Sequence, residues 1–181
     1  VLAAVTQNVN ALQYASSLLK GDADVVRQSV IADTNEKFYP DQLQFADDEL
    51  MSNKAFVMQL VAHSGMALKY ASEALKDDEE VVEVAVRQCG FALFNATRRL
   101  RDDKRLVLLS VKEDSSSLQY HHQFKNYIQV VTAAMNKNEC ILQWAHRDLY
   151  DNDDFMLKMI RICAFSIHFI GDALKNNQQF L

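Results

Sequence analysis

One phrase recurs along this chain and constrains its fold more than any other feature of the sequence. It reads ALQYASSLLKGDADVV at 11–26, ALKYASEALKDDEEVV at 67–82, ALFNATRRLRDDKRLV at 92–107 and ILQWAHRDLYDNDDFM at 141–156. The second residue of the phrase, Leu or Ile, is taken as an anchor, and successive anchors are 31, 25, 25, 25, 24 and 25 residues apart. The seven anchors are Leu12, Leu43, Leu68, Leu93, Leu118, Leu142 and Ile167. A period of roughly 20–50 residues is the signature of a repeat architecture.

Other positions also keep their character when each repeat, numbered one to seven, is counted from its anchor. Position +7 is leucine in most repeats, and position −7 carries an apolar residue in most of them. An aromatic residue occupies position +2 in six repeats, at Tyr14, Phe45, Tyr70, Tyr120, Trp144 and Phe169. This many positions in register indicate a true structural repeat.

Each repeat predicts two short helices, the first over roughly −13 to −5 and the second continuing past the anchor to about +8. Asp or Asn recurs at positions +9 and +10, where a short side-chain oxygen can cap the first helix of the next repeat. The 181 residues include only four Gly and one Pro, in agreement with an all-helical chain. Helices this short need neighbours to be stable. We therefore expect an all-α fold, a right-handed-type α-solenoid of about seven helix-pair repeats of about 25 residues.

The bulk composition bounds the class of protein. We expect a single helical-repeat domain over residues 1–181, cut from a longer array, because the chain starts and stops within the repeat pattern. The net charge of −5 argues against a nucleic-acid or anionic-membrane partner. No apolar run is long enough for a transmembrane segment. Three widely spaced cysteines imply no disulfide framework, which favours a reducing, cytoplasmic location.

A helical wheel at about 100° per residue separates the faces of the second helix. It places the +2 aromatics in the core between repeats, with a stacking platform for ligands as the alternative. Position +1 faces water, and its row of amides around one aromatic is our candidate surface for a protein partner, the alternative being an ordinary solvated surface. This row consists of Gln13, Gln44, Lys69, Phe94, Gln119, Gln143 and His168.

Two further segments depart from the pattern. A basic run within residues 98–112 is an alternative site, where a lipid headgroup or a nucleic acid would bind, unless local ion pairs neutralise it. Its cations are Arg98, Arg99, Arg101, Lys104 and Arg105. Six extra residues within 32–41 predict a loop, either a tolerated insertion or a second contact surface.

The sequence contains none of the motifs of common catalytic sites. It has no Gly-rich phosphate loop, nucleophile elbow, HExxH or paired CxxC. His122 and His146 share position +4 in successive repeats but have no third metal ligand. We expect a protein that is not an enzyme and that uses no cofactor or metal.

The phrases ALKYASEALKDDEEVVEVAVRQCGFALFNA (67–96) and VLAAVTQNVNALQYAS (1–16) resemble the helical-repeat family catalogued as domain of unknown function 4116. The family is common in proteins of intracellular bacteria and of protists, so the resemblance implies an accessory interaction module. Such a module would act in the cytoplasm, or in a host cytosol if it belongs to a secreted bacterial effector. The expected function is a non-catalytic protein–protein interaction scaffold, with its partner and oligomeric state left open.

Overall fold

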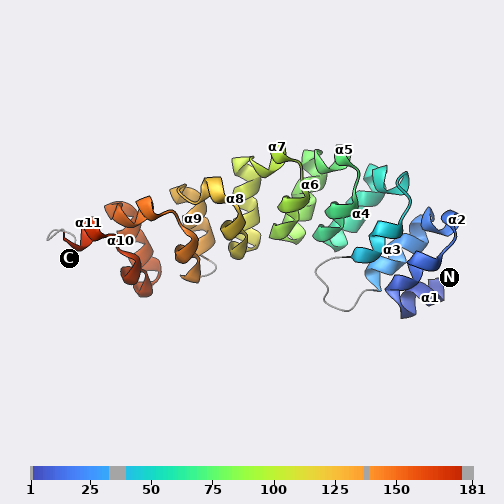
Figure 1. The fold of residues 1–181 in the computed structure, drawn as a ribbon, viewed down its shortest axis with the longest axis horizontal. Helices are drawn as coiled ribbons and strands as arrows, with labels where there is room; N and C mark the ends of the chain where they lie inside the picture. Colours follow the sequence, from blue (N-terminus) through green and yellow to red (C-terminus); the bar gives the residue numbers. More distant parts are fainter. Residues whose placement is uncertain (1, 33–39, 137–138, 177–181) are drawn as a thin grey trace. The chain divides into compact units, whose positions relative to one another are not determined.

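The computed structural model describes residues 2–32, 40–136 and 139–176 (Figure 1). This part of the chain is all-helical, built from α-helices and 3-10 helices, and contains no strand. None of its helices combines the length and the apolar character that crossing a membrane requires. The chain divides into two compact bodies, an N-terminal body (residues 1–106) and a C-terminal body (residues 107–181), and each is described by itself.

The N-terminal body repeats a series of three elements. Its longer helices are α1 (Leu2–Gln7), α3 (Ala23–Ile31), α4 (Lys54–His63) and α6 (Glu79–Gln88), and α8 (Lys104–Glu113) begins at its end. The anchors lie in 3-10 helices, which are η1 (Val9–Tyr14), η2 (Asp41–Phe45), η4 (Gly65–Tyr70) and η5 (Gly90–Asn95). One-turn helices complete the series, namely α2 (Ser17–Lys20), η3 (Leu50–Ser52), α5 (Glu73–Lys76) and α7 (Arg98–Arg101).

Elements of the same kind pack side by side in the N-terminal body. Helix α3 contacts α1 and α4, and α4 contacts α6. The 3-10 helices contact one another in the same order, η1 with η2, η2 with η4 and η4 with η5. In Figure 1 the one-turn helices α5 and α7 lie at one end of the longer helices α4 and α6.

The C-terminal body follows the same series of elements. Its longer helices are α9 (Ile128–Met135) and α10 (Asp153–Ile162), which pack on each other. Its anchors lie in η6 (Ser115–Tyr120), η8 (Glu139–Trp144) and η10 (Ala164–Phe169), and η8 contacts both of the others. The short elements are η7 (His122–Phe124), η9 (Arg147–Asp151) and α11 (Asp172–Lys175), so the short element is a 3-10 helix in repeats five and six, as it is in repeat two.

The prediction of one continuous second helix in each repeat is wrong. In repeat three the 3-10 helix η4 ends at Tyr70, and Ala71 and Ser72 are extended before α5 begins. The reason is a hydrogen bond between repeats. The backbone N–H of Ser72 donates to the carbonyl of Met51 in repeat two, at 3.0 Å. This N–H therefore cannot donate to a carbonyl within a helix of its own repeat.

The same backbone bond recurs from position +4 of one repeat to the end of the short element of the repeat before it. In the N-terminal body its donor and acceptor pairs are Asp47 and Lys20 (3.0 Å), Ser72 and Met51 (3.0 Å), and Thr97 and Lys76 (3.1 Å). In the C-terminal body they are His146 and Lys125 (2.8 Å), and Gly171 and Tyr150 (2.8 Å). We call each of these bonds a rung.

The prediction that Asp and Asn cap the next longer helix is confirmed, and position +10 supplies the cap. Asn53 Oδ1 accepts from the backbone N–H of Phe56 at 3.1 Å, and Asp78 Oδ1 accepts from Glu80 at 3.0 Å and Val81 at 3.2 Å. The residues at +10 that cap in this way are Asp22, Asn53, Asp78, Asp103 and Asn152.

The core consists of the anchors and of the residues that share their face. A 3-10 helix turns about 120° per residue, so positions −3, 0 and +3 point the same way. In repeat three these are Gly65, Leu68 and Ala71, all buried. The predicted burial of the +2 aromatics is wrong for two of them for the same reason: Tyr14 is 84% exposed and Tyr120 is 53% exposed, whereas the others are partly buried.

Candidate interaction surface

The 3-10 helices of the N-terminal body bring the +1 and +2 side chains of four repeats onto neighbouring elements. Because η1, η2, η4 and η5 pack in sequence, these side chains follow one another along one side of the body. We call this surface the ridge. It consists of Gln13, Tyr14, Gln44, Phe45, Lys69, Tyr70, Phe94 and Asn95.

Solvent reaches every member of the predicted +1 row in this body. Gln44 and Lys69 are exposed, whereas Gln13 and Phe94 are half-buried. Phe94 is partly covered by Phe91, whose ring centroid is 5.9 Å away. The ridge therefore offers aromatic and amide groups that no other part of the body fully covers.

Polar contacts hold part of the ridge in place. The Lys69 ammonium lies 5.0 Å from the centroid of the Tyr70 ring and 3.5 Å from the Asp41 carboxylate. The Tyr70 hydroxyl donates to that same carboxylate. Partial burial and then the Asp41 carboxylate raise the pKa of the Tyr70 phenol, so it stays protonated and remains a donor at neutral pH. Ordered aromatic side chains lose less entropy on binding than free ones.

The rest of the predicted row lies in the C-terminal body, on η6, η8 and η10. Gln119 is half-buried, and Gln143 and His168 are exposed. The His168 ring meets Phe165 edge-on, with the centroids 4.7 Å apart. Each body thus presents its own stretch of +1 side chains on adjacent 3-10 helices.

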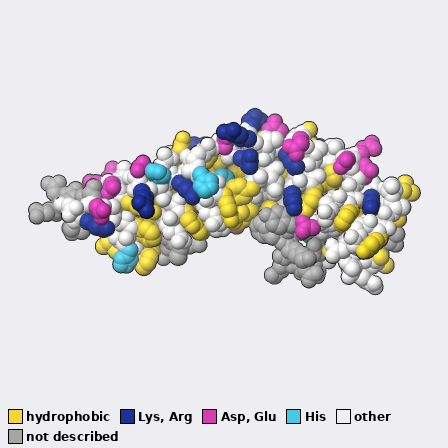
Figure 2. Space-filling model, in the orientation of Figure 1, with side chains coloured by type: hydrophobic (Ala, Val, Ile, Leu, Met, Phe, Trp, Pro, Cys, Tyr) yellow, Lys and Arg dark blue, Asp and Glu magenta, His cyan; other side chains and the backbone are white. Residues whose placement is uncertain are grey.

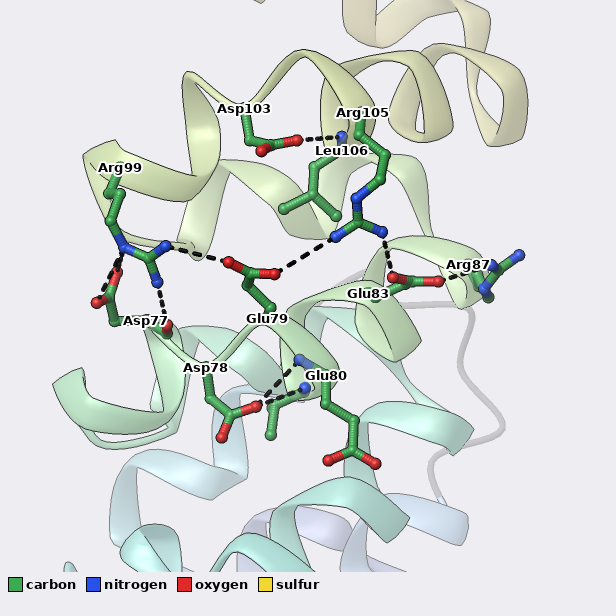
Figure 3. A network of polar contacts seen from close by, with 11 residues as sticks. Asp77, Asp78, Glu79, Glu80, Glu83, Arg87, Arg99, Asp103, Arg105 and Leu106 are labelled. Atoms are coloured by element: carbon green, nitrogen blue, oxygen red, sulfur yellow. Dashed lines mark hydrogen bonds and ion pairs between the residues drawn. The ribbon is translucent and has the colours of Figure 1, made fainter.

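The basic run lies among carboxylates of residues 77–83. Figure 2 shows cationic and anionic side chains gathered together over the region of α5–α7. Arg99 binds the Asp77 carboxylate at 3.1 and 3.3 Å, the Glu79 carboxylate at 3.2 Å and the Asp77 carbonyl at 2.7 Å (Figure 3). The Thr97 hydroxyl donates to Asp77 as well. Every nitrogen of this guanidinium therefore has an acceptor within its own body.

Arg105 continues the network between Glu79 and Glu83 (Figure 3). Glu83 also accepts from Arg87 at 2.7 Å, and Arg98 faces Asp102 at 3.5 Å. Arg101 and Lys104 are exposed. Because its central arginines are already paired, the run has the character of a solvated face with local ion pairs, which was the alternative to an anion site.

The network lowers the pKa of three carboxyl groups. Thr97 and then Arg99 lower the pKa of Asp77, Lys54 and the capped backbone N–H groups lower that of Asp78, and Arg105 and then Arg87 lower that of Glu83. Each group is thus more acidic folded than unfolded. Its contribution to stability is complete above the ordinary pKa, 3.8 for Asp and 4.5 for Glu, and is lost as the pH falls through the lower folded pKa.

We expect the urea midpoint of unfolding to fall as the pH is lowered from about 5 to about 3, and to fall less in 1 M NaCl. An Arg99→Gln/Arg105→Gln variant removes partners of Asp77 and Glu83 and should show a smaller fall over the same range. Far-UV circular dichroism at several pH values measures this. An equal fall in both proteins would mean that other groups govern the acid sensitivity.

A buried polar cluster in the C-terminal body brings a histidine and two serines together. The Ser110 hydroxyl donates to Ser117 Oγ at 3.0 Å and lies 3.3 Å from His121 Nε2. Serine beside histidine is an element of hydrolytic sites. Here, however, Ser110 and Ser117 are 0% exposed and His121 is 5% exposed, so the contacts serve to satisfy buried polar groups. The signal in the sequence was His121 at position +3, where most repeats have alanine.

The remaining candidate residues form no cluster. Among residues 2–32, 40–136 and 139–176 there is no group of three His, Cys, Asp or Glu side chains that could hold a metal ion. His146 Nδ1 lies 3.2 Å from the Asp148 carboxylate. Cys89 is half-buried and Cys163 is buried. Most of the predicted loop within 32–41, residues 33–39, lies outside the described residues.

Comparison with known proteins relates the centre of the N-terminal body to one family. No curated protein and no solved structure matches the chain. Two overlapping segments, residues 37–76 and 53–101, match a family model. They include the phrase at 67–96 that carried most of the resemblance, and the 3-10 helices η4 and η5 of the ridge. Residues 37–101 are therefore similar to the family described as Domain of unknown function (DUF4116).

Proposed function

We propose that this chain is a non-catalytic protein–protein interaction module, and that a partner protein binds the +1 and +2 side chains on its 3-10 helices. The observation that carries the proposal is the ridge, in which aromatic and amide side chains of successive repeats share one solvent-reached surface. Aromatic side chains supply much of the binding energy of protein interfaces, and amides satisfy the polar groups of the partner.

We further propose that the repeats stack as a right-handed α-solenoid of about seven units. The rung supports this, because the same backbone bond joins successive repeats in both bodies. Ion pairs between repeats support it as well, for instance Lys54 with Glu80 at 2.8 Å and Arg99 with Asp77 at 3.1 Å. In such an array each repeat contacts only its neighbours, which leaves a long surface for recognition.

The proposed module works in a reducing compartment, in the cytoplasm or in a host cytosol if the parent protein is a secreted bacterial effector. The three widely spaced cysteines of the sequence agree with this setting. A lipid or nucleic-acid partner is less favoured, because Arg99 and Arg105 already bind carboxylates.

Affinity capture with surface variants tests the proposal. A Gln44→Glu/Lys69→Glu variant alters two exposed residues of the ridge, and Gln143→Glu alters the stretch in the C-terminal body. Gln59→Glu places a similar charge on the exposed face of α4 and is the matched control. We expect the unaltered chain and the control to retain the same protein, and at least one surface variant to lose it by about tenfold or more. Equal retention by all four folded proteins would overturn the assignment of the surface.

A further inference from the structure

The N-terminal body has an open groove between the short elements α2 and η3. Its volume is about 390 Å³. Two carboxylates and no cation are among its lining residues, which are Ser17, Leu18, Gly21, Asp47, Glu49, Leu50 and Asn53. The groove therefore combines negative charge with an apolar wall.

The repeat itself contains a filled version of the same place, two repeats further along. Between α5 and α7, the Arg99 side chain reaches back to the preceding repeat and binds Asp77 through its carboxylate and its carbonyl. The Thr97 hydroxyl also donates to the Asp77 carboxylate. In repeat four, therefore, the guanidinium of Arg99 fills the place that corresponds to the groove.

Counting from the anchors shows what repeats one and two have in its place. Gly21 stands where repeat three has Asp77, and Glu49 stands where repeat four has Arg99. The position of Thr97 is taken by Asp47. The guanidinium and its carboxylate are both missing, and two other carboxylates line the space instead.

The backbone frame around the two places is the same. The rung from Asp47 to Lys20 measures 3.0 Å, and the equivalent rung from Thr97 to Lys76 measures 3.1 Å. Asp22 caps α3 as Asp78 caps α6. The groove therefore corresponds to the place that Arg99 occupies in repeat four, but without an arginine.

An apolar side chain beside the groove suits the stem of an arginine. Leu18 lines the groove and is 86% exposed, so its side chain is open to a ligand. Arginine is amphipathic, with three methylenes that pack on apolar surface while its head group binds carboxylates. Leu18 and the two carboxylates match these two parts.

We infer that this groove binds an arginine side chain of a partner polypeptide, with the guanidinium between Asp47 and Glu49 and the methylenes against Leu18. The inference rests on the proposed function, since it names a chemical feature of the protein partner, but it concerns a surface distinct from the ridge. Arginine is preferred to lysine because its planar fork can bind two carboxylates at once, as Arg99 does with Asp77 and Glu79.

The test is a nuclear magnetic resonance titration of the 181-residue chain with the dipeptide probe acetyl-Leu-Arg-amide. Matched probes carry citrulline, which has the same shape without the charge, or lysine. We expect the arginine probe to shift the amide signals of Gly21, Asp47, Glu49 and Leu50, and the citrulline probe to leave them unchanged. A Glu49→Gln variant should bind about tenfold more weakly, because a hydrogen bond to a charged group is worth roughly that factor.

A second variant rebuilds the filled version of the site. In Gly21→Asp/Glu49→Arg the chain supplies its own arginine and carboxylate, so binding of the probe should be lost. Glu49→Gln provides the answer if the double variant does not fold. Equal shifts with arginine, lysine and citrulline, or unchanged binding to the rebuilt groove, would overturn the inference. A ridge variant that loses its protein partner but still binds the arginine probe separates this result from that of the proposed function.

Discussion

Replacing Leu68 by alanine is expected to lower the free energy of unfolding by about 3 kcal/mol, within the range of roughly 2–5 kcal/mol for buried leucines. Leu68 is the anchor of repeat three and is 0% exposed. Its 3-10 helix η4 contacts α4, α6, η2 and η5, so the cavity would lie where several elements meet. Neighbouring 3-10 helices are held by rungs between repeats and can collapse into the cavity only in part.

The same change at Leu18 is the matched control. Leu18 is 86% exposed, so Leu18→Ala should change the free energy of unfolding by less than about 0.5 kcal/mol. Leu68→Met, which nearly conserves volume, should cost less than about 1.5 kcal/mol. Urea unfolding followed by far-UV circular dichroism measures all three variants. If Leu68→Ala were no worse than Leu18→Ala, the anchors would not be the core of the repeats.

The parts of the fold that follow from local sequence could be predicted. The regular spacing of the anchors indicates that they are buried. The same apolar place must be filled in each repeat, and this limits the anchors to Leu or Ile. Six of the seven anchors are at most 1% exposed, and Ile167 at 49% is the exception. Caps were predictable because Asp78 or Asn53 satisfies N–H groups only two or three residues away.

The parts that depend on a neighbouring repeat could not be predicted. The second helix is interrupted after Tyr70 because the N–H of Ser72 donates to Met51, 21 residues earlier in the chain. The pattern of residues within one repeat gives no sign of this bond. A continuous α-helix, with about 100° per residue, would place the +2 aromatics in the core. In the 3-10 geometry these side chains reach the surface instead. In the N-terminal body they are part of the ridge and not of the core.

The groove and the ion pairs show the same limit. Arg99 considered by itself suggests an anion site, but its partner Asp77 belongs to the preceding repeat. The signal was present in the alignment of the repeats, where Gly21 and Glu49 replace Asp77 and Arg99 together. It could be interpreted only once the rungs had shown which positions of successive repeats meet.

Replacing Gly65 by alanine is expected to destabilise the N-terminal body by about 3 kcal/mol, at the upper end for overpacking of an interior. Gly65 is buried at the start of η4, and its N–H donates to Gln88 Oε1 at 2.6 Å. An added Cβ would lie 2.3 Å from the carbonyl oxygen of Ala85 and 2.9 Å from Gln88 Oε1. The carbonyl belongs to the backbone of α6 and cannot turn away, so η4 or α6 would have to move.

Gly21→Ala is the matched control, because a Cβ there meets nothing closer than 3.7 Å and the backbone of Gly21 is right-handed helical. It should leave stability unchanged or raise it by about 0.4–1 kcal/mol through the unfolded state. A Gly65→Ala/Gln88→Ala double variant separates the two contacts, since it removes the side-chain oxygen and leaves the Ala85 carbonyl in place. Stability should stay low in the double variant if the backbone contact dominates. Recovery to the level of Gln88→Ala alone would assign the cost to the glutamine, and the requirement for glycine at position 65 would then lie in a side chain that can move rather than in the close approach of two repeats.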